Sequence, residues 1–509
     1  MAIAHQYDSL QIGSAKTLPL PWRNAALLLA CTIPLWFSLP TIGDPYGQTE
    51  EGVNNAIWAL GGRNIIRRGP IAAKLGAVVA PYPGTGGGVY AHHPPLPIWL
   101  SALIQTITNW EGAPRLLALV LVALSLAVLF SMLTNYVSET TALVSVAVVA
   151  LSPWVLIYSR MLTTLTVATP LFAVLLRSVL LRVHGNRAWG VPTLLVIAAL
   201  VLSSWDGVIG SAVLVATLSW AELRDAFRGN LRGRAWLRVI APAIAWTTTL
   251  AALLVYLIKA NHGPGELIGQ AVMRSGLNQF DAVAWTGDEI RYAGEGLGWL
   301  TLILLAGAYA VCGRLPQGRR LYLATSLAAV PGMGMILLFR NGAHWHDFWG
   351  YNLFLAAGFG VAAVLEFFRR ALPEPAKISL LFLLGGQSTL AARSAGAQLE
   401  REHNLNQLGV FVKQNLATAG LQNVKMFWAY DFHPYIAWYL EKPQDVSLSL
   451  PSLQRKVESG QWKREDQVVV DNLFAANLRC RGLGSRIDSS TRRWSITSVG
   501  ELENSCQGH

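Results

Sequence analysis

Ionisable side chains gather in this sequence at the ends of long apolar runs. They combine carboxylates, imidazoles and guanidiniums, side chains that exchange protons and bind anions: Glu50, Glu51, His92, His93, Glu111, Arg115, Arg160, Asp206, His344, His346 and Asp347. Such groups are costly at the end of a membrane span unless they pair or face a wet cavity. The basic residues of the short loops indicate an orientation that places all of these groups on one side of the membrane. Together they predict a single polar site on that side. The alternative is that span ends simply carry polar residues.

The segment 43–112 contains a basic amphipathic helix, predicted over 56–68. Arg63, Arg67 and Arg68 stand between apolar residues in this stretch. A helix of this kind suits the membrane interface, where its arginines bind lipid phosphate or anchor it to headgroups. Both interpretations stay open for Arg67 and Arg68, whereas Arg63 favours the phosphate role.

Two adjacent histidines, His92 and His93, precede Pro94 and Pro95 in the same segment. The prolines restrict the backbone, so the imidazoles are candidates for contacting a phosphate or diphosphate. A metal site is a weaker interpretation because no i, i+4 partner is present. The glycine-rich turn at 81–88 lacks the lysine and the strand–helix frame of a P-loop.

A second polar cluster comes late in the chain, where His344, His346 and Asp347 surround Trp345. Tryptophan at such a point is typical of the interfacial belt. The histidines and the aspartate together favour a functional role. Asp206 stands alone at the start of another apolar run.

The composition is that of a membrane protein. The chain has 509 residues, of which 53% are hydrophobic and 14% charged, against about 25% charged in soluble domains. The net charge of +11 does not indicate nucleic acid, because lysines and arginines cluster between the apolar runs. The four cysteines, Cys31, Cys312, Cys480 and Cys506, show no metal-binding spacing.

We predict an α-helical polytopic membrane protein with about 11 transmembrane helices, each long enough for a hydrocarbon core of about 30 Å. The expected spans are 24–42, 113–134, 139–158, 163–183, 189–204, 207–222, 238–258, 298–313, 320–339, 348–368 and 376–393. The apolar stretch 96–107 begins with prolines and is too short to span, so it is expected to lie at the interface.

Orientation follows from the basic residues of the short loops. The amino terminus and the loops that hold Arg182, Arg224, Arg314 and Arg369 are predicted to face the cytoplasm. The ionisable cluster and the tail at 394–509 then lie outside an inner or plasma membrane.

The tail is expected to form a small extracytoplasmic α/β domain beyond a transmembrane domain at 1–393. A helix is predicted over 399–416, with strands at 424–430 and 468–471. In an oxidising compartment Cys480 and Cys506 could form a disulfide.

Several of these segments resemble the GT-C superfamily of membrane glycosyltransferases that use polyprenyl-phosphate sugars, including the protein O-mannosyltransferase and aminoarabinose transferase relatives. The matching pieces are Glu51 followed by Arg63-Asn64-Ile65-Ile66-Arg67-Arg68-Gly69, then His93-Pro94-Pro95-Leu96, then Glu111 with Arg115, and then Arg160-Met161. A late His-x-His-Asp element, here His344 to Asp347, is also similar. The resemblance covers about 40–370.

The sequence departs from the family pattern at two places. Family members usually carry an acidic residue shortly after the Arg-Met element, where this chain has Thr163, Thr164 and Thr166. The spacing from Glu51 to Arg63 also differs by about one helical turn.

The resemblance implies roles for the candidate residues. A carboxylate would take the proton of an acceptor, and positive or hydrogen-bonding groups would stabilise the departing lipid phosphate. The predicted bases are Glu51, then Glu50, then Asp44. The residues expected to bind donor phosphate or sugar are Arg63, His92, His93, Arg160, His344, His346 and Asp347. Asp206, Glu111 and Arg115 are expected to orient the acceptor or to be structural.

The predicted function is therefore transfer of a sugar from a polyprenyl-phosphate donor to a glycan, lipid or protein acceptor, with inversion at the anomeric carbon. A divalent metal is a candidate cofactor. A lipid-linked sugar flippase would place ionisable residues nearer the middle of spans. A non-catalytic scaffold that binds the lipid-linked sugar would not need Glu51.

Overall fold

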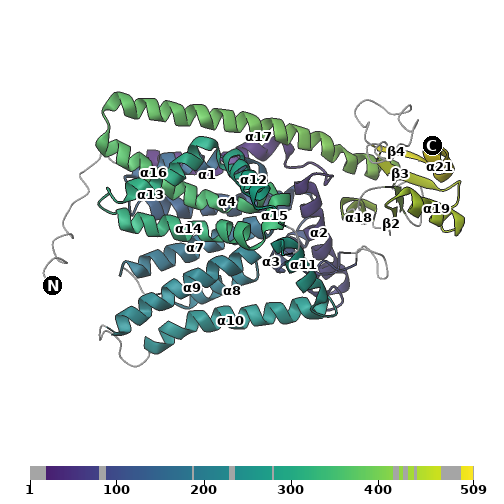
Figure 1. Ribbon diagram of the computed structural model, residues 1–509, viewed down its shortest axis with the longest axis horizontal. Helices are drawn as coiled ribbons and strands as arrows, with labels where there is room; N and C mark the ends of the chain where they lie inside the picture. The colour runs from purple at the N-terminus through teal and green to yellow at the C-terminus, as the bar shows by residue number, and fades with distance from the viewer. Residues whose placement is uncertain are drawn as a thin grey trace.

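The computed structural model describes residues 19–79, 88–185, 189–227, 235–277, 280–416, 424–427, 434–440, 444–471 and 494–507. Most of these residues are helical, and the helices form an elongated bundle with a small sheet at one end (Figure 1). Cys480 and the segment Asp431-Phe432-His433 lie outside the described residues.

Within the described residues, the bundle contains seventeen α-helices, α1 to α17, and three short 3-10 helices. The first half consists of α1 (Leu20–Ser38), η1 (Leu39–Thr41), α2 (Glu50–Arg68), η2 (Lys74–Gly76), α3 (Leu96–Gln105), α4 (Gly112–Leu133), α5 (Glu139–Ala150), α6 (Pro153–Tyr158), α7 (Thr164–Val183) and α8 (Val191–Val201). The second half consists of α9 (Trp205–Asp225), α10 (Ala235–Ala260), α11 (Gly265–Ser275), α12 (Ala282–Leu297), α13 (Trp299–Cys312), α14 (Gly318–Leu338), α15 (Arg340–Trp345), η4 (Asp347–Gly350) and α16 (Leu353–Ala371).

The apolar helices make the chain an integral membrane protein. Within the described residues, six helices are long and apolar enough to cross a membrane, and the bent pair α12 and α13 raises this number to seven. Three shorter apolar helices, α3, α5 and α8, accompany them. The figure of about 11 spans thus remains a prediction.

One expected span is interrupted and another is preceded by a sharp bend, each for an identifiable reason. The stretch 139–158 divides into α5 and α6 because Ser152, which precedes Pro153, has the extended backbone that this position favours. The axes of α12 and α13 differ by 106°. The bend lies at Gly298, whose φ of +88° is readily adopted by glycine alone.

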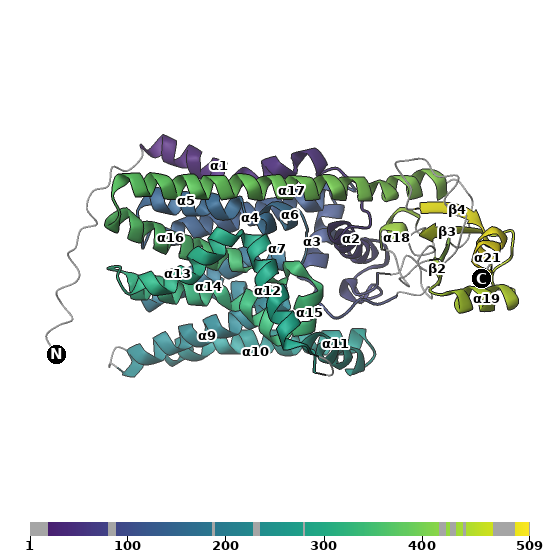
Figure 2. The ribbon, with the colours of Figure 1, turned by 45° about the horizontal axis from the view of Figure 1, so that its top comes forward.

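The last helix of the bundle, α17 (Glu374–Leu416), is 43 residues long. It joins the expected span 376–393 and the expected helix 399–416 into one element, so the predicted boundary at 393 falls inside a helix. Its central sequence is rich in alanine and other strong helix formers. Figure 2 shows α17 running along the whole bundle and reaching the sheet.

The sheet is four-stranded, with the order β2-β1-β3-β4. Its elements are β1 (Val424–Phe427), α18 (Pro434–Leu440), β2 (Gln444–Ser447), α19 (Leu450–Glu458), β3 (Gln467–Asp471), β4 (Trp494–Ser498) and α21 (Val499–Gln507). β1 pairs in parallel with β2 and β3, and β4 is antiparallel to β3. Helix α18 packs on α2 and α17, which connects the sheet to the bundle.

Helices α2, α3, α11 and α15 lie at the end of the bundle next to the sheet (Figure 1). Helix α3 is present where the apolar stretch 96–107 predicts it. It packs directly against α2, because Gly62 leaves room for its backbone: a Cβ at Gly62 would lie 2.7 Å from the nitrogen of Ala102. This close packing fixes the position of α2, which carries the first candidate carboxylates.

Candidate active site

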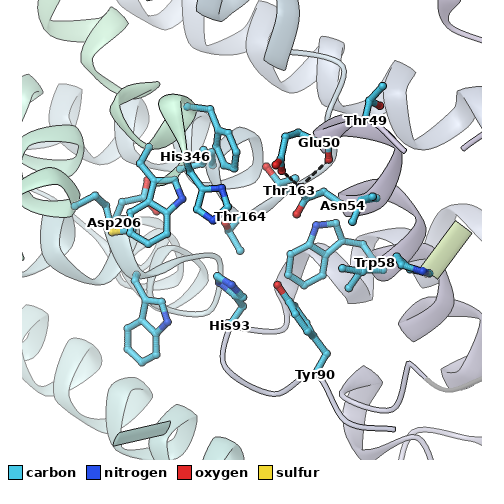
Figure 3. A pocket seen from close by; sticks show the side chains of 18 of the residues that line it. Thr49, Glu50, Asn54, Trp58, Tyr90, His93, Thr163, Thr164, Asp206 and His346 are labelled. Carbon is cyan, nitrogen blue, oxygen red and sulfur yellow. Dashed lines mark hydrogen bonds between the residues drawn. The ribbon is translucent and has the colours of Figure 1, made fainter. Parts of the chain in front are cut away.

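A cavity of about 420 Å³ lies at this end of the bundle. Its wall is formed by helix α2, the segment before α3, the first turns of α7 and α9, helix α11, the connection from α15 to α16, and α18. Its polar lining consists of Gln48, Thr49, Glu50, Asn54, Tyr90, His93, Thr163, Thr164, Asp206, Arg274, His346 and Tyr435. Figure 3 shows Glu50 and Asn54 on one side of the cavity, with His93 and Tyr90 across from them.

The neighbouring carboxylates Glu50 and Glu51 point in different directions. Thr49 caps the start of α2, its hydroxyl oxygen accepting a hydrogen bond from the amide of Gly52 at 2.9 Å. Successive side chains on a helix are rotated by about 100°. The Glu50 carboxylate therefore lines the cavity, whereas Glu51 is fully buried in the protein.

Glu51, predicted as the first choice of base, is the centre of a buried ion-pair network. Nε of Arg115 lies 2.5 Å from its Oε1 and Nη2 lies 3.2 Å from its Oε2. The amide of Asn55 donates a further hydrogen bond, and Arg160 approaches to 3.9 Å. Burial alone would raise the pKa of Glu51, but the guanidiniums of Arg115 and Arg160 outweigh it and lower the pKa. Both carboxylate oxygens of Glu51 thus accept hydrogen bonds within the protein, and the neighbouring guanidiniums favour the ionised form.

Glu50 has the opposite environment. Its side chain is accessible from the cavity, and its neighbour Asn54 donates to its backbone oxygen at 2.7 Å and to Oε2 at 3.5 Å. Desolvation by the surrounding protein raises the pKa of Glu50, and the carboxylates of Asp347 and Glu402 raise it further. A carboxylate with a raised pKa is a stronger proton acceptor than an ordinary one.

Across the cavity, Arg274 of α11 supplies a positive charge. Its Nη1 lies 3.4 Å from Nε2 of His93, and its guanidinium lies over the ring of Trp349 at 5.7 Å. His93 also stacks on Tyr90, with ring centroids 5.6 Å apart. A guanidinium held between aromatic rings is suited to bind a phosphate.

The three histidines near Arg274 are neutral near neutral pH. Burial, reinforced by Arg274, lowers the pKa of His92 to about 3 and that of His346 to about 4. Burial and the neighbouring His92, Arg274 and His346 lower the pKa of His93 well below its usual range. These imidazoles therefore offer hydrogen bonds, not positive charge, and Arg274 carries the charge of this wall.

The late cluster divides between the cavity and its surroundings. His346 lines the cavity and stacks on Trp349 with an interplanar angle of 20°. Asp347 accepts hydrogen bonds from the hydroxyl of Tyr158 at 2.8 and 2.9 Å. His344 turns away, with Nδ1 3.0 Å from a carboxylate oxygen of Asp288 on α12.

Asp206 lines the cavity at the first turn of α9, where its carboxylate accepts a hydrogen bond from the amide of Asn352. The hydroxyl of Thr169 in turn donates to the amide oxygen of Asn352 at 2.5 Å. This chain of bonds holds Asp206 in place between α7, α9 and the start of α16.

Other candidate residues are bound elsewhere. Arg63 donates to the carbonyls of Trp438 and Ala437 on α18, at 2.9 and 3.2 Å. Arg160 is fully buried and donates to Thr41 and to Glu402 of α17.

Asp44 lies 2.8 Å from Nδ1 of His403 on α17. Glu111 precedes α4, four residues before Arg115. None of Arg63, Arg160, Asp44, Glu111 and Arg115 lines the cavity. They connect α2, α4, α17 and α18 around it.

The structure resembles known membrane glycosyltransferases over nearly the whole length of this chain. ArnT from Cupriavidus metallidurans bound to undecaprenyl phosphate superimposes with a TM-score of 0.61 and 11% identity, covering 95% of this chain and 98% of ArnT. Apo ArnT gives a TM-score of 0.54 with the same identity and coverage. The apo oligosaccharyltransferase of Archaeoglobus fulgidus gives 0.53 at 11% identity, covering 89% of this chain and 70% of that enzyme. No protein-family model and no curated protein matches the sequence.

The chain shares the fold of these structures. Thr163 and Thr164, which follow Arg160-Met161 and begin α7, line the cavity with hydroxyl groups.

A metal was a candidate cofactor from the sequence. Within the described part of the chain, no group of three His, Cys, Asp or Glu side chains is placed to hold a metal ion. The carboxylate of Glu50 lines the cavity, whereas that of Asp347 does not and already accepts hydrogen bonds from Tyr158. We assign no step to a metal.

Little in the sequence marks Arg274, which lines the cavity. It lies between the expected spans 238–258 and 298–313, in a segment that the predicted orientation places outside, against the usual preference of basic residues for the inner side. A further signal lies in the helical spacing of Leu267, Ala271 and Arg274, which share one face of α11 and line a smaller pocket of about 160 Å³.

Proposed function

We propose that this protein is a glycosyltransferase that takes a sugar from a polyprenyl-phosphate donor and transfers it to a hydroxyl or amide acceptor in the cavity. One observation carries the proposal: the accessible carboxylate of Glu50 and the guanidinium of Arg274 line the same cavity, with Arg274 beside His93. The first group can accept a proton and the second can stabilise a leaving phosphate.

The reaction can be written with these residues. The acceptor O–H or N–H loses its proton to Glu50 as its oxygen or nitrogen forms a bond to the anomeric carbon. The bond from that carbon to the phosphate oxygen breaks, and its electron pair leaves with the polyprenyl phosphate. Arg274 binds the charge that develops on the phosphate, while His93 and Tyr90 donate or accept hydrogen bonds around it. Attack opposite to the leaving phosphate inverts the anomeric centre.

The lipid-linked donor is supported by the shape of the site. The smaller pocket beside the cavity shares Trp205, Arg274, Met335 and Trp349 with it. The remaining wall of this pocket is mainly apolar, with Leu267 and Phe339. Arg274 thus stands where a polar cavity meets an apolar one, as a lipid phosphate requires. The related ArnT structure is itself bound to undecaprenyl phosphate.

The orientation predicted from the basic loops would place this cavity on the extracytoplasmic side of an inner or plasma membrane. The sheet, which adjoins the cavity through Pro434 and Tyr435, would share that side. Labelling of single cysteines from outside intact cells tests this placement.

Sugar transfer should be measured in proteoliposomes with a panel of radiolabelled polyprenyl-phosphate sugars and extracts that supply acceptors. Donor cleavage that requires Glu50 supports the proposal. Movement of intact donor between leaflets without cleavage would identify a flippase instead. Saturable donor binding with neither activity would identify a scaffold.

A further inference from the structure

A second polar pocket, of about 90 Å³, lies between α4, α7 and α14. We refer to it as the distal pocket. Its polar lining consists of Asn135, Tyr136, Arg177, His184 and Arg320, and apolar side chains complete the wall. None of the described residues that line it carries a carboxylate.

The distal pocket lies at the opposite end of the bundle from the candidate active site. Helix α7 begins at Thr164 on the first cavity and reaches Arg177 and His184 at the second pocket. At 1.5 Å per residue, this separation along α7 is about 20–30 Å. Helix α14 runs the other way, with Arg320 near its start and Met335 on the first cavity. The two sites are therefore about one hydrocarbon thickness apart.

The arginines of the distal pocket differ from the other arginines at this end. Most of those are paired with carboxylates: Arg182 with Glu222 and Asp225, Arg369 and Arg370 with Glu366, and Arg23 with Glu139. Within the described residues, neither Arg177 nor Arg320 forms an ion pair with a carboxylate. Nε of Arg177 donates to the hydroxyl of Ser131 at 3.2 Å, which leaves its terminal nitrogens for another acceptor.

Neutral hydrogen-bonding groups stand beside these charges. The hydroxyl of Tyr136 lies 3.2 Å from Nε2 of His184. Burial and the nearby Arg320 lower the pKa of His184 to about 4, so the imidazole is neutral near neutral pH. Two guanidiniums, a hydroxyl, an imidazole and an amide thus surround a small open pocket, a set that matches the charge and the acceptor oxygens of a phosphate.

We propose that the distal pocket binds the phosphate of an anionic lipid headgroup, in the leaflet opposite the candidate active site. The lipid source is favoured because α4, α7 and α14 are all long and apolar enough to cross a membrane and the pocket lies at their ends. Headgroup phosphates lie at this depth, and juxtamembrane arginines bind them. The proposal does not depend on the transferase reaction.

The test is native mass spectrometry of the full-length protein in detergent, titrated with phosphatidylglycerol and, separately, with zwitterionic phosphatidylcholine. Wild type is compared with Arg177→Gln/Arg320→Gln and with the control Arg314→Gln/Arg319→Gln, which loses the same charge at the same end. We expect the first variant to bind phosphatidylglycerol at least about tenfold more weakly than wild type and the control to remain within about twofold.

The single variant Arg320→Gln separates a loss of lipid binding from a loss of folding, because the Arg320 side chain is exposed and lies in the first turn of α14. It should weaken phosphatidylglycerol binding while keeping the melting temperature. Displacement of the lipid by millimolar inorganic phosphate would show that the pocket takes free phosphate, and would overturn the lipid source. Equal affinities for wild type, Arg320→Gln and both double variants would overturn the distal pocket as an anion site.

Discussion

The carboxylate of Glu51 is bound by the guanidinium of Arg115, with Nε of Arg115 2.5 Å from Oε1 and both side chains almost completely buried. This pair joins the first turn of α2 to α4. It turns Glu51 into the protein and leaves Glu50, one residue earlier, facing the cavity. The two neighbouring glutamates therefore have different environments, one paired inside the protein and one on the cavity wall.

Breaking this pair should cost stability. Removing one partner of a buried ion pair leaves an uncompensated charge and typically costs about 3–5 kcal/mol. We expect Glu51→Gln to lower the melting temperature of the purified protein clearly, as measured by thermal unfolding in detergent. Glu50→Gln, with its accessible side chain, serves as the control and should change it little. A Glu51→Gln protein as stable as wild type would contradict the structural role.

The pH dependence of transfer should report Glu50. Because the base must be ionised, kcat/KM falls as the pH drops below its pKa, which burial and the carboxylates of Asp347 and Glu402 hold above the ordinary value of about 4.3. Asp347→Asn removes one of these negative charges, so the pKa of Glu50 should fall and the acid limb should move to lower pH. Glu111→Gln, which does not line the cavity, should leave the limb in place. If the acid limb of the pH profile stays at the same pH in Asp347→Asn, the assignment of Glu50 as the base is contradicted.

Removal of the positive charge across the cavity should slow the reaction more than it weakens donor binding. Loss of a group that stabilises developing charge typically costs about a hundredfold to a thousandfold in kcat. We expect a loss of this size in Arg274→Gln and a smaller one in Arg274→Lys, measured as initial rates at saturating donor. Arg291→Gln, an exposed arginine of α12 paired with Asp288, is the control. Unchanged kcat in Arg274→Gln would exclude the proposed role.

The packing of α2 on α3 should not tolerate a side chain at Gly62. A Cβ there would lie 2.7 Å from the backbone nitrogen of Ala102, so one of the two helices must move. Overpacking of this kind typically costs about 1–3 kcal/mol. We expect Gly62→Ala to lower the melting temperature, whereas Gly287→Ala, which has open space around it on α12, should leave it unchanged or raise it. Equal melting temperatures would show that α3 adjusts freely.

The sequence predicts much of this architecture because its signals are local. Apolar length predicts the long helices, and the two prolines before Leu96 predict the short helix α3. The predicted strands at 424–430 and 468–471 correspond to β1 and β3. The sequence did not predict that one helix, α17, continues through residue 393, because hydropathy falls there while helix propensity does not.

The site was harder to predict because it depends on distant contacts. The sequence places Glu50 and Glu51 side by side, but the rotation of α2 that separates them is set by Arg115, 64 residues away. Arg160 and Arg63 have the residue type of a phosphate ligand, yet bonds to Glu402 and to the carbonyls of α18 occupy them. Arg274 belongs to no motif and becomes visible only when α11 packs beside His93 and Trp349.

The most direct test of the central claim is sugar transfer by Glu50→Gln in proteoliposomes with the donor that wild type uses, with donor binding measured on the same samples. Glu111→Gln is the matched control, a carboxylate lost outside the cavity. The account predicts that Glu50→Gln binds donor as wild type does while its transfer rate falls at least about a hundredfold, and that Glu111→Gln retains transfer. Transfer by Glu50→Gln within a few-fold of wild type would contradict the account.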